Sequence, residues 1–292
     1  MKVVGIGGGH GLATTLRAAR LYSDSVSGVV SVADDGGSSG RLTAELGMPP
    51  PGDIRNCLVA LSDGGPLAEM FQHRFTKGTL EGHPIGNLVI AALVEMRGDF
   101  ALAVEEAGRI IGAQGKVFPS TTELVRLSAL VEGEVVDGQV AVARSKETIG
   151  SVHLTPPSPE AHPEAVQAIK EADQVVLGPG SLYTSVIAAL LVPGISTAVQ
   201  ETQALKVFVC NAKVQPGETD RLGVEEHVEA VLAHTGGPCI DVVVIQDPRS
   251  QDGVERRAGP WPWRDIAVVE ADVAHEDGIH YPERLAKVLA GL

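Results

Sequence analysis

Two adjacent carboxylates and a run of small residues form the most chemically informative stretch of this chain. Asp34 and Asp35 end the apolar run that begins at Val29, and Gly36-Gly37-Ser38-Ser39-Gly40 separates them from Arg41. Glycine and serine let the backbone approach a ligand closely and direct N–H groups at phosphate or pyrophosphate. The carboxylates are expected at the C-terminal end of a strand, where open α/β sheets bind ligands. There they could accept hydrogen bonds from ribose hydroxyls or hold a Mg²⁺ ion that bridges to phosphate.

Two glycine-rich loops also follow predicted strands. The first, Gly7-Gly8-Gly9-His10-Gly11, precedes a helix whose apolar residues recur at Leu12 and Leu16. The second, Gly178-Pro179-Gly180-Ser181-Leu182-Tyr183-Thr184-Ser185, follows the strand 174–177 and precedes another apolar helix. A helix N-terminus placed after such a loop offers backbone N–H groups to an anion. The strict G-x-G-x-x-G fingerprint is not met, because Leu12 occupies the position of its last glycine, and this disfavours a nicotinamide-dependent oxidoreductase.

Further polar residues stand where helices are predicted to begin. Asp53 follows a triple proline and is expected either to cap a helix or to contact the ligand. Arg55, in the first turn of that helix, is a candidate anion contact. Asn87 follows Gly86 at the start of an apolar helix and could contact a base, a sugar or another loop. His10 could contact phosphate or a base, or have no chemical role.

Composition excludes several classes of protein. The 292 residues include 23 Lys and Arg against 37 Asp and Glu, a formal net charge of −14 at pH 7 that repels nucleic acid and anionic lipid. No run approaches the roughly 18 apolar residues of a membrane span, and no basic segment precedes an apolar one at the N-terminus. The three cysteines share no metal-ligand spacing and are expected to be reduced, mostly buried thiols. We therefore expect a cytoplasmic protein that binds neither nucleic acid nor membrane.

Alternating strand and helix signals predict an α/β fold. We expect a Rossmann-like, three-layer α/β/α arrangement around a parallel sheet, with residues 1–292 in one domain. Residues 3–35 and 174–211 should form the two halves of the sheet, with the glycine loops adjacent at its C-terminal edge. The segment 116–155 is predicted to be a small β-rich insertion, because alternating valines flank a hairpin signal at Asp137-Gly138.

Several of these segments form an ordered series of different motifs along the chain. Besides the two glycine loops and the stretch 33–42, the motifs are Pro50-Pro51-Gly52-Asp53-Ile54-Arg55-Asn56, Gly82-His83-Pro84-Ile85-Gly86-Asn87 and Gln215-Pro216-Gly217-Glu218-Thr219, the last preceded by Asn211. Over residues 1 to about 235 their order and spacing resemble the gluconeogenesis factor family, the YvcK branch of the CofD-like superfamily. The last part, with Trp261-Pro262-Trp263 and Gly278-Ile279-His280-Tyr281, matches less clearly. His10 stands where many relatives have a threonine.

The resemblance implies a cytoplasmic bacterial protein that binds nucleotide sugars such as UDP-N-acetylglucosamine. It implies a role in cell shape and cell-wall synthesis during growth on gluconeogenic carbon, without an established catalytic activity. The sister branch transfers a phospholactyl group from a nucleoside-diphosphate donor to the deazaflavin Fo, and such a transferase is the alternative. The Gly180-Ser181-Leu182-Tyr183 form of the second loop is closer to the regulatory branch. An aromatic content of 3% disfavours a large stacking pocket for a flavin-like acceptor.

The predicted ligand-binding residues lie in or next to these motifs: Gly7, Gly8, Gly9, His10, Gly11, Asp34, Asp35, Gly36, Gly37, Ser38, Ser39, Arg41, Asp53, Arg55, Asn56, Asn87, Gly178, Gly180, Ser181, Tyr183, Thr184, Asn211 and Gln215. No catalytic residue is assigned. No metal or other cofactor is required, although Asp34 and Asp35 could hold Mg²⁺. The expected partner is a nucleotide sugar or another nucleotide, and the chain is compatible with a homodimer.

Overall fold

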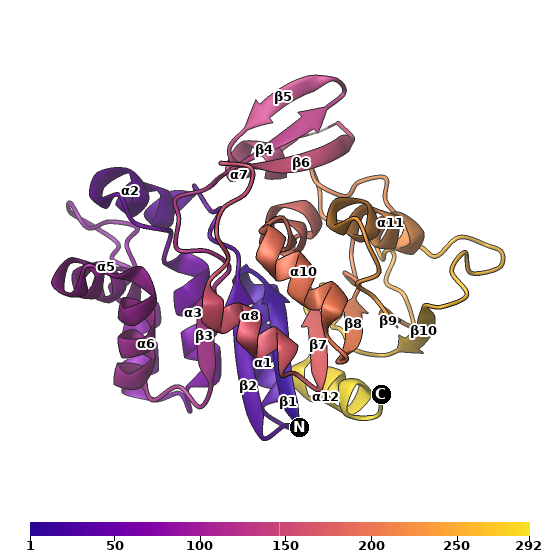
Figure 1. Ribbon diagram of the computed structural model, residues 1–292, viewed down its shortest axis with the longest axis horizontal. Helices are drawn as coiled ribbons and strands as arrows, with labels where there is room; N and C mark the ends of the chain where they lie inside the picture. Colours follow the sequence, from indigo (N-terminus) through magenta and orange to yellow (C-terminus); the bar gives the residue numbers. More distant parts are fainter. Residues whose placement is uncertain (146) are drawn as a thin grey trace.

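The computed structural model describes residues 1–145 and 147–292, and a seven-stranded parallel sheet forms its centre (Figure 1). The strands are β1 (Lys2–Gly7), β2 (Ser25–Val30), β3 (Lys116–Pro119), β7 (Gln174–Leu177), β8 (Leu205–Val209), β9 (Val242–Gln246) and β10 (Ala267–Ala271). Their order across the sheet is β10-β9-β8-β7-β1-β2-β3, and every neighbouring pair is parallel. The strand connections therefore reverse direction between β1 and β7. This topology confirms the predicted Rossmann-like α/β fold and the pairing of its two halves.

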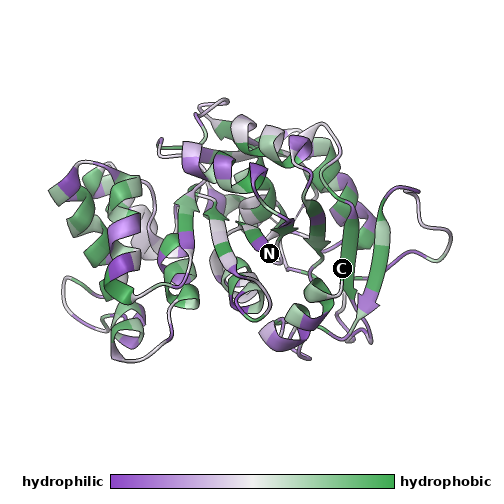
Figure 2. Cartoon of the chain, turned by 60° about the horizontal axis from the view of Figure 1, so that its bottom comes forward, coloured by the Kyte–Doolittle hydropathy of each residue, from purple (hydrophilic) through white to green (hydrophobic). Residues whose placement is uncertain are grey.

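Helices cover both faces of the sheet. One face carries α1 (Gly9–Ala19), α3 (Gly52–Leu61) and α12 (Pro282–Ala290), and the other carries α8 (Pro163–Lys170), α10 (Pro193–Glu201) and α11 (Val224–Thr235). Successive strand residues alternate between the two cores: Val3 packs with the first group of helices and Val4 with the second. Because both faces are covered, the strands are apolar along most of their length, as the green colour in Figure 2 shows.

Further helices extend the fold beyond β3. They are α2 (Gly37–Leu46), α4 (Pro66–Gln72), α5 (Ile85–Arg97) and α6 (Phe100–Ile111), of which α2, α5 and α6 are labelled at the left of Figure 1. The second glycine loop continues into a π-helical turn, η1 (Leu182–Ile187), and the short helix α9 (Ala188–Leu190). In the part of the chain that the structure describes, no single helix has the length and apolar character to cross a membrane. Two consecutive helical segments, Leu182–Leu190 and Pro193–Glu201, reach that length and apolar character only when they are taken together, and they are bent by 78° relative to each other.

A small antiparallel sheet lies above the C-terminal edge of the main sheet (Figure 1). Its strands are β4 (Arg126–Val131), β5 (Glu134–Asp137) and β6 (Ile149–Thr155), in the order β5-β4-β6. Strand β3 instead pairs with β2 in the main sheet, so the β-rich segment is narrower than the expected 116–155. The hairpin turn is also not at Asp137-Gly138. It falls at Glu132 and Gly133, whose φ angles of 47° and 89° suit a tight hairpin turn.

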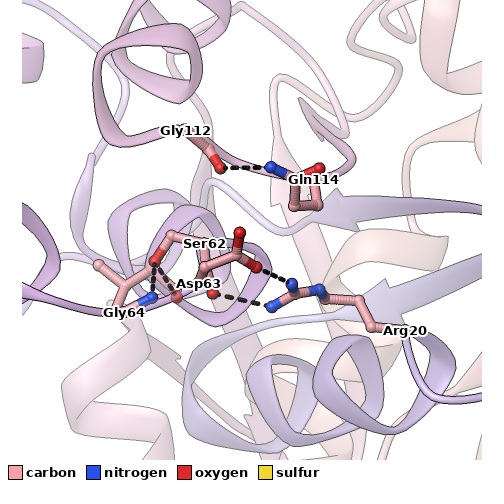
Figure 3. A network of polar contacts seen from close by, with 7 residues as sticks. Arg20, Ser62, Asp63, Gly64, Gly112 and Gln114 are labelled. Atoms are coloured by element: carbon pink, nitrogen blue, oxygen red, sulfur yellow. Dashed lines mark hydrogen bonds and ion pairs between the residues drawn. The ribbon is translucent and has the colours of Figure 1, made fainter.

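Polar contacts fix the ends of α1 and α3 that lie away from the C-terminal edge of the sheet (Figure 3). Arg20, just after α1, donates a hydrogen bond to the carbonyl of Ser62 at 2.8 Å and forms an ion pair with Asp63, just after α3. The backbone N–H of Gln114 donates to the carbonyl of Leu61 at 2.7 Å. The two helices are thus joined at their C-terminal ends, and their N-terminal ends are held at the same edge of the sheet.

The three cysteines, Cys57, Cys210 and Cys239, are buried and form no disulfide. This confirms the prediction of buried thiols made from their number and spacing.

Candidate functional site

A cavity of about 330 Å³ lies where the strand connections reverse, between the loops that follow β1 and β7. Its wall consists of Gly8, Gly9, His10, Gly11, Ser31, Asp34, Asp53, Gln139, Gly180, Ser181, Thr184, Ser185 and Gln215. In open α/β sheets, loops from neighbouring strands diverge at such a point and leave a crevice that binds ligands. The two glycine loops are therefore adjacent, as the sequence predicted.

Glycine is required where the first loop meets the second. A Cβ atom on Gly11 would overlap the carbonyl oxygen of Pro179 and lie 2.6 Å from its carbonyl carbon. A Cβ atom on Gly8 would lie 2.6 Å from a carboxylate oxygen of Asp53. Gly180 has a φ of +143°, a conformation that residues with a side chain rarely adopt. A side chain at Gly8, Gly11 or Gly180 would clash with a neighbour or strain the backbone, which explains why these positions are glycine.

The N-terminus of α1 faces the cavity without a side-chain cap. Its N-cap residue is Gly8, its first turn contains no acidic residue, and Gly9, His10 and Gly11 all line the cavity. The first N–H groups of a helix have no partner within the helix, and the helix dipole makes this end favourable for an anion. The α1 N-terminus is therefore suited to a phosphate or pyrophosphate group.

Asp34 and Asp53 are the two carboxylates in the cavity wall. Asp34 is half-buried and accepts a hydrogen bond from the N–H of Gly36 at 2.9 Å, and burial raises its pKa. Asp53 does not cap α3, because Pro51 is the N-cap residue and Asp53 lies in the first turn. Burial, followed by repulsion from Asp34, raises the pKa of Asp53 to about 7, against opposing effects of the Gly9 N–H and Arg55.

Asp35 points away from its neighbour Asp34. Its two carboxylate oxygens accept hydrogen bonds from the N–H groups of Gln139 and Val140, at 3.0 and 2.9 Å. These residues begin α7 (Gln139–Ala143), so Asp35 accepts hydrogen bonds from N–H groups in the first turn of that helix. Asp137-Gly138 leads into α7. The Asp34–Asp35 pair does not fit a shared Mg²⁺ ion, because only Asp34 faces the cavity. Among the described residues no group of three or more His, Cys, Asp or Glu is arranged to hold a metal.

The second glycine loop is held by a buried carboxylate, Glu218, that is not among the predicted ligand-binding residues. Glu218 accepts hydrogen bonds from the N–H groups of Tyr183 and Thr184 at 2.6 and 3.0 Å, and from the Thr184 hydroxyl. Burial raises its pKa, whereas these hydrogen bonds lower it. Two N–H groups at the start of η1 are therefore already bonded within the protein. The second loop offers the ligand fewer free N–H groups than its sequence suggested.

Two amide side chains complete the support of this loop. Asn211 accepts a hydrogen bond from the N–H of Gly180 at 3.0 Å and donates to the side-chain oxygen of Gln215 at 3.1 Å. Gln215 in turn donates to the Ser181 hydroxyl at 3.4 Å. Gln215 lines the cavity, whereas Asn211 lies behind the loop and positions it. Tyr183 is buried, and its hydroxyl donates to the carbonyl of Ile149.

Arg55 is buried in a polar network that joins α2, α3 and α5. Its guanidinium donates to the side-chain oxygens of Asn87 and Asn56 at 3.1 and 2.6 Å. Asn87 donates to the hydroxyl of Ser38 at 3.0 Å, and Ser38 also contacts the His83 ring. Burial is the main cause that lowers the pKa of Arg55, to about 10. Because Arg55 does not line the cavity, its role here is to fix α2, which follows the Asp34 loop.

Comparison with known proteins decides the family. A family model described as 2-phospho-L-lactate transferase CofD matches residues 3–283. The chain belongs to the CofD family. The gluconeogenesis factor of Halalkalibacterium halodurans is 43% identical over 259 residues, covering 88% of this chain and 80% of that protein. The gluconeogenesis factor of Bacillus subtilis is 44% identical over 259 residues, covering 88% and 82%. These relatives confirm the resemblance inferred from the motifs.

The same architecture is found in a solved structure of a UPF0052 family member. A crystal structure of a protein from Bacillus halodurans superposes with a TM-score of 0.94 and 36% sequence identity, covering 99% of this chain and 98% of that chain. At this identity and coverage the similarity includes the C-terminal part, where the motifs alone matched less clearly. The fold of this CofD-family chain therefore extends over nearly its full length.

Ten of the predicted residues line the cavity of this CofD-family member, and others lie behind it. Outside the wall are Gly7, Asp35, Gly36, Gly37, Ser38, Ser39, Arg41, Arg55, Asn56, Asn87, Gly178, Tyr183 and Asn211. Arg41, for example, donates a hydrogen bond to the carbonyl of Glu81 instead. Three wall residues were not predicted: Ser31, Gln139 and Ser185. Ser185 lies within the second glycine loop and Ser31 lies in the apolar run that ends at Asp34, whereas nothing in the sequence places Gln139 near them. Ligand binding by any of these residues stays a prediction.

Proposed function

We propose that this chain is a regulatory protein that binds nucleotide sugars, with UDP-sugars as the preferred class. The observation that carries the proposal is the cavity at the β1–β7 reversal point, walled by both glycine loops and by the N-terminus of α1. The relatives named gluconeogenesis factor support the regulatory reading. In this proposal the protein acts in the cytoplasm and supports cell shape and cell-wall synthesis during growth on gluconeogenic carbon.

In this proposal, different residues of the cavity wall bind different parts of the nucleotide sugar. The pyrophosphate binds the N–H groups at the start of α1, where Gly9 and Gly11 allow close approach. Asp34 accepts hydrogen bonds from hydroxyls of the ribose or the sugar. The side-chain amides of Gln139 and Gln215, which also line the cavity, contact other polar groups of the ligand. The described residues of the wall include no lysine or arginine, so backbone N–H groups balance the phosphate charge. This arrangement favours a ligand that combines an anion with several hydroxyls.

A ligand panel tests the proposal directly. Purified protein is incubated with UDP-, GDP- and ADP-sugars and NAD, and thermal unfolding is followed for each. A ligand that binds only the folded state raises the melting temperature as its concentration rises. We expect the largest shift with UDP-sugars. Shifts with NAD alone, or with none of the panel, would contradict the proposal.

The alternative function is phospholactyl transfer, because the family model that matches this chain is described as a 2-phospho-L-lactate transferase. A turnover assay with Fo and a lactyl diphosphonucleoside separates the two. Transfer by the wild type that is lost on Asp34→Asn would establish the transferase. We expect no transfer.

Replacing Gly180 by valine should abolish UDP-sugar binding while the fold survives. The φ of +143° strains any residue with a β-branched side chain, and a Cβ atom there would lie 3.7 Å from the carbonyl oxygen of Gly8 and 3.9 Å from the Cα of Gly11. The side chain would extend into the space between the two loops. Calorimetry measures affinity, and circular dichroism checks folding. Unchanged affinity in a folded variant would show that the second loop is only a turn.

The adjacent carboxylates should respond differently to the same substitution. Asp34→Asn should weaken UDP-sugar binding roughly tenfold to a hundredfold, since a carboxylate–hydroxyl hydrogen bond contributes about 1.5–3 kcal/mol. Asp35→Asn should have a smaller effect, because Asp35 does not line the cavity and influences it only by positioning Gln139 at the start of α7. Calorimetry with and without Mg²⁺ checks both variants, and the loss should be the same in either condition. A loss for Asp34→Asn that occurs only with Mg²⁺ would indicate cation binding instead.

A further inference from the structure

Asp53 places a carboxylate at the site that we assign to the ligand phosphate. It projects from the first turn of α3 toward the first turn of α1, with which α3 packs closely. A Cβ atom on Gly9, the first residue of α1, would lie 3.7 and 3.9 Å from its two oxygens. The N–H groups at the start of α1, of which that of Gly9 already stabilises Asp53, therefore face a carboxylate of the protein itself, and a phosphate binding there would meet it.

The groups around Asp53 do not neutralise it. Asp34 approaches from the loop after β2 and repels it. The charge of Arg55, two residues along α3, offsets this only in part, because its guanidinium is bonded to Asn56 and Asn87. From α1, the Gly9 N–H stabilises the carboxylate and His10 is exposed at the cavity. From η1, the Ser185 hydroxyl lies beside Gly8. One turn further along α3 is the buried thiol of Cys57. An arriving pyrophosphate would add negative charge to this already acidic group of side chains.

Building on the proposed function, we propose that Asp53 takes up one proton when the ligand binds and donates it in a hydrogen bond to a phosphate oxygen. The proton comes from solvent, no covalent bond changes, and the neutral carboxyl group removes the repulsion between the two anions. Asp53 thereby makes affinity for the anionic ligand depend on pH. It also disfavours anions that cannot accept this hydrogen bond.

The sign of the pH dependence follows from the state of the free protein. Because the pKa of Asp53 is raised to about 7, the group is largely protonated below that pH and binding needs no proton uptake. Above it, each binding event consumes a proton, so affinity should fall roughly tenfold per pH unit. The pyrophosphate of a UDP-sugar has no proton that titrates in this range, so the ligand itself does not produce the effect.

Calorimetry with UDP-N-acetylglucosamine tests the coupling in the full-length protein. Titrations from about pH 6 to about pH 8.5, in two buffers of different ionisation enthalpy, give both affinity and the number of protons taken up. Wild type should take up close to one proton at the upper end. Asp53→Asn should take up none and should keep the same affinity across the range. Asp63→Asn, an exposed carboxylate just after the other end of α3, should behave like wild type.

The outcomes separate the two proposals. Binding by the wild type without proton uptake and without pH dependence would overturn the role of Asp53 but leave the nucleotide-sugar site intact. No binding at any pH would overturn both. Because absence of proton uptake by the wild type would by itself overturn the role of Asp53, the proposal remains falsifiable even if Asp53→Asn folds poorly. In Asp34→Asn, which removes the neighbouring repulsion, the pH at which affinity begins to fall should be lower than in wild type.

Discussion

Replacing Gly11 by alanine is expected to weaken UDP-sugar binding by more than about a hundredfold and to lower the melting temperature. The added methyl group would overlap the Pro179 carbonyl oxygen and lie 2.6 Å from its carbon and 2.8 Å from the Cα of Gly180. These neighbours are backbone atoms of the second glycine loop, so no side chain can rotate away. Relief requires α1 to move off that loop, which separates the two walls of the cavity. Overpacking of this kind typically costs about 1–3 kcal/mol of stability.

Gly37→Asn is a matched control for this substitution. Gly37 is the first residue of α2 and has a φ of +49°, a conformation that asparagine tolerates. A Cβ atom there would contact nothing within 4 Å. Calorimetry and thermal unfolding of both variants should show a large loss for Gly11→Ala and little change for Gly37→Asn. Wild-type affinity in Gly11→Ala would mean that the two loops are not packed as described.

Glu218→Ala should lower the free energy of unfolding by about 2–4 kcal/mol. The substitution removes the acceptor for the N–H groups of Tyr183 and Thr184, which are buried and would be left without partners. The start of η1 would loosen, and with it the part of the cavity wall formed by Thr184 and Ser185. UDP-sugar affinity should therefore fall together with stability. Urea unfolding measures the first effect and calorimetry the second.

Glu218→Gln separates the hydrogen bonds from the charge. The amide oxygen of glutamine can still accept from both N–H groups, and the neutral side chain avoids the burial of a charge. We expect this variant to retain most of the stability and affinity. If Glu218→Gln were as damaging as Glu218→Ala, the negative charge itself would be required. If Glu218→Ala were as stable as wild type, this carboxylate would not hold the loop.

Local patterns in the sequence were enough to predict most strands of the main sheet, though not β3, and the edge at which the two glycine loops meet. Apolar β-branched runs such as Val29–Val32 favour strands, and Gly7–Gly11 and Gly178–Gly180 interrupt the chain directly after two of them. Parallel strands with helical connections place all such loops at one edge, so the two glycine loops could be predicted to meet. These conclusions depend on preferences of neighbouring residues, which a single sequence contains.

Tertiary structure decided which polar groups face the cavity. Asp34 and Asp35 are adjacent, yet one lines the cavity and the other bonds to the start of α7, over a hundred residues later in the chain. Glu218 binds the loop at Tyr183, and Arg55 donates to Asn87 from a position behind the cavity wall. The Asp137-Gly138 signal failed for the same reason, because Asp35 holds the following residues as a helix. A buried polar group takes whichever partner the packing of distant segments brings within hydrogen-bond distance, and local sequence does not specify that partner.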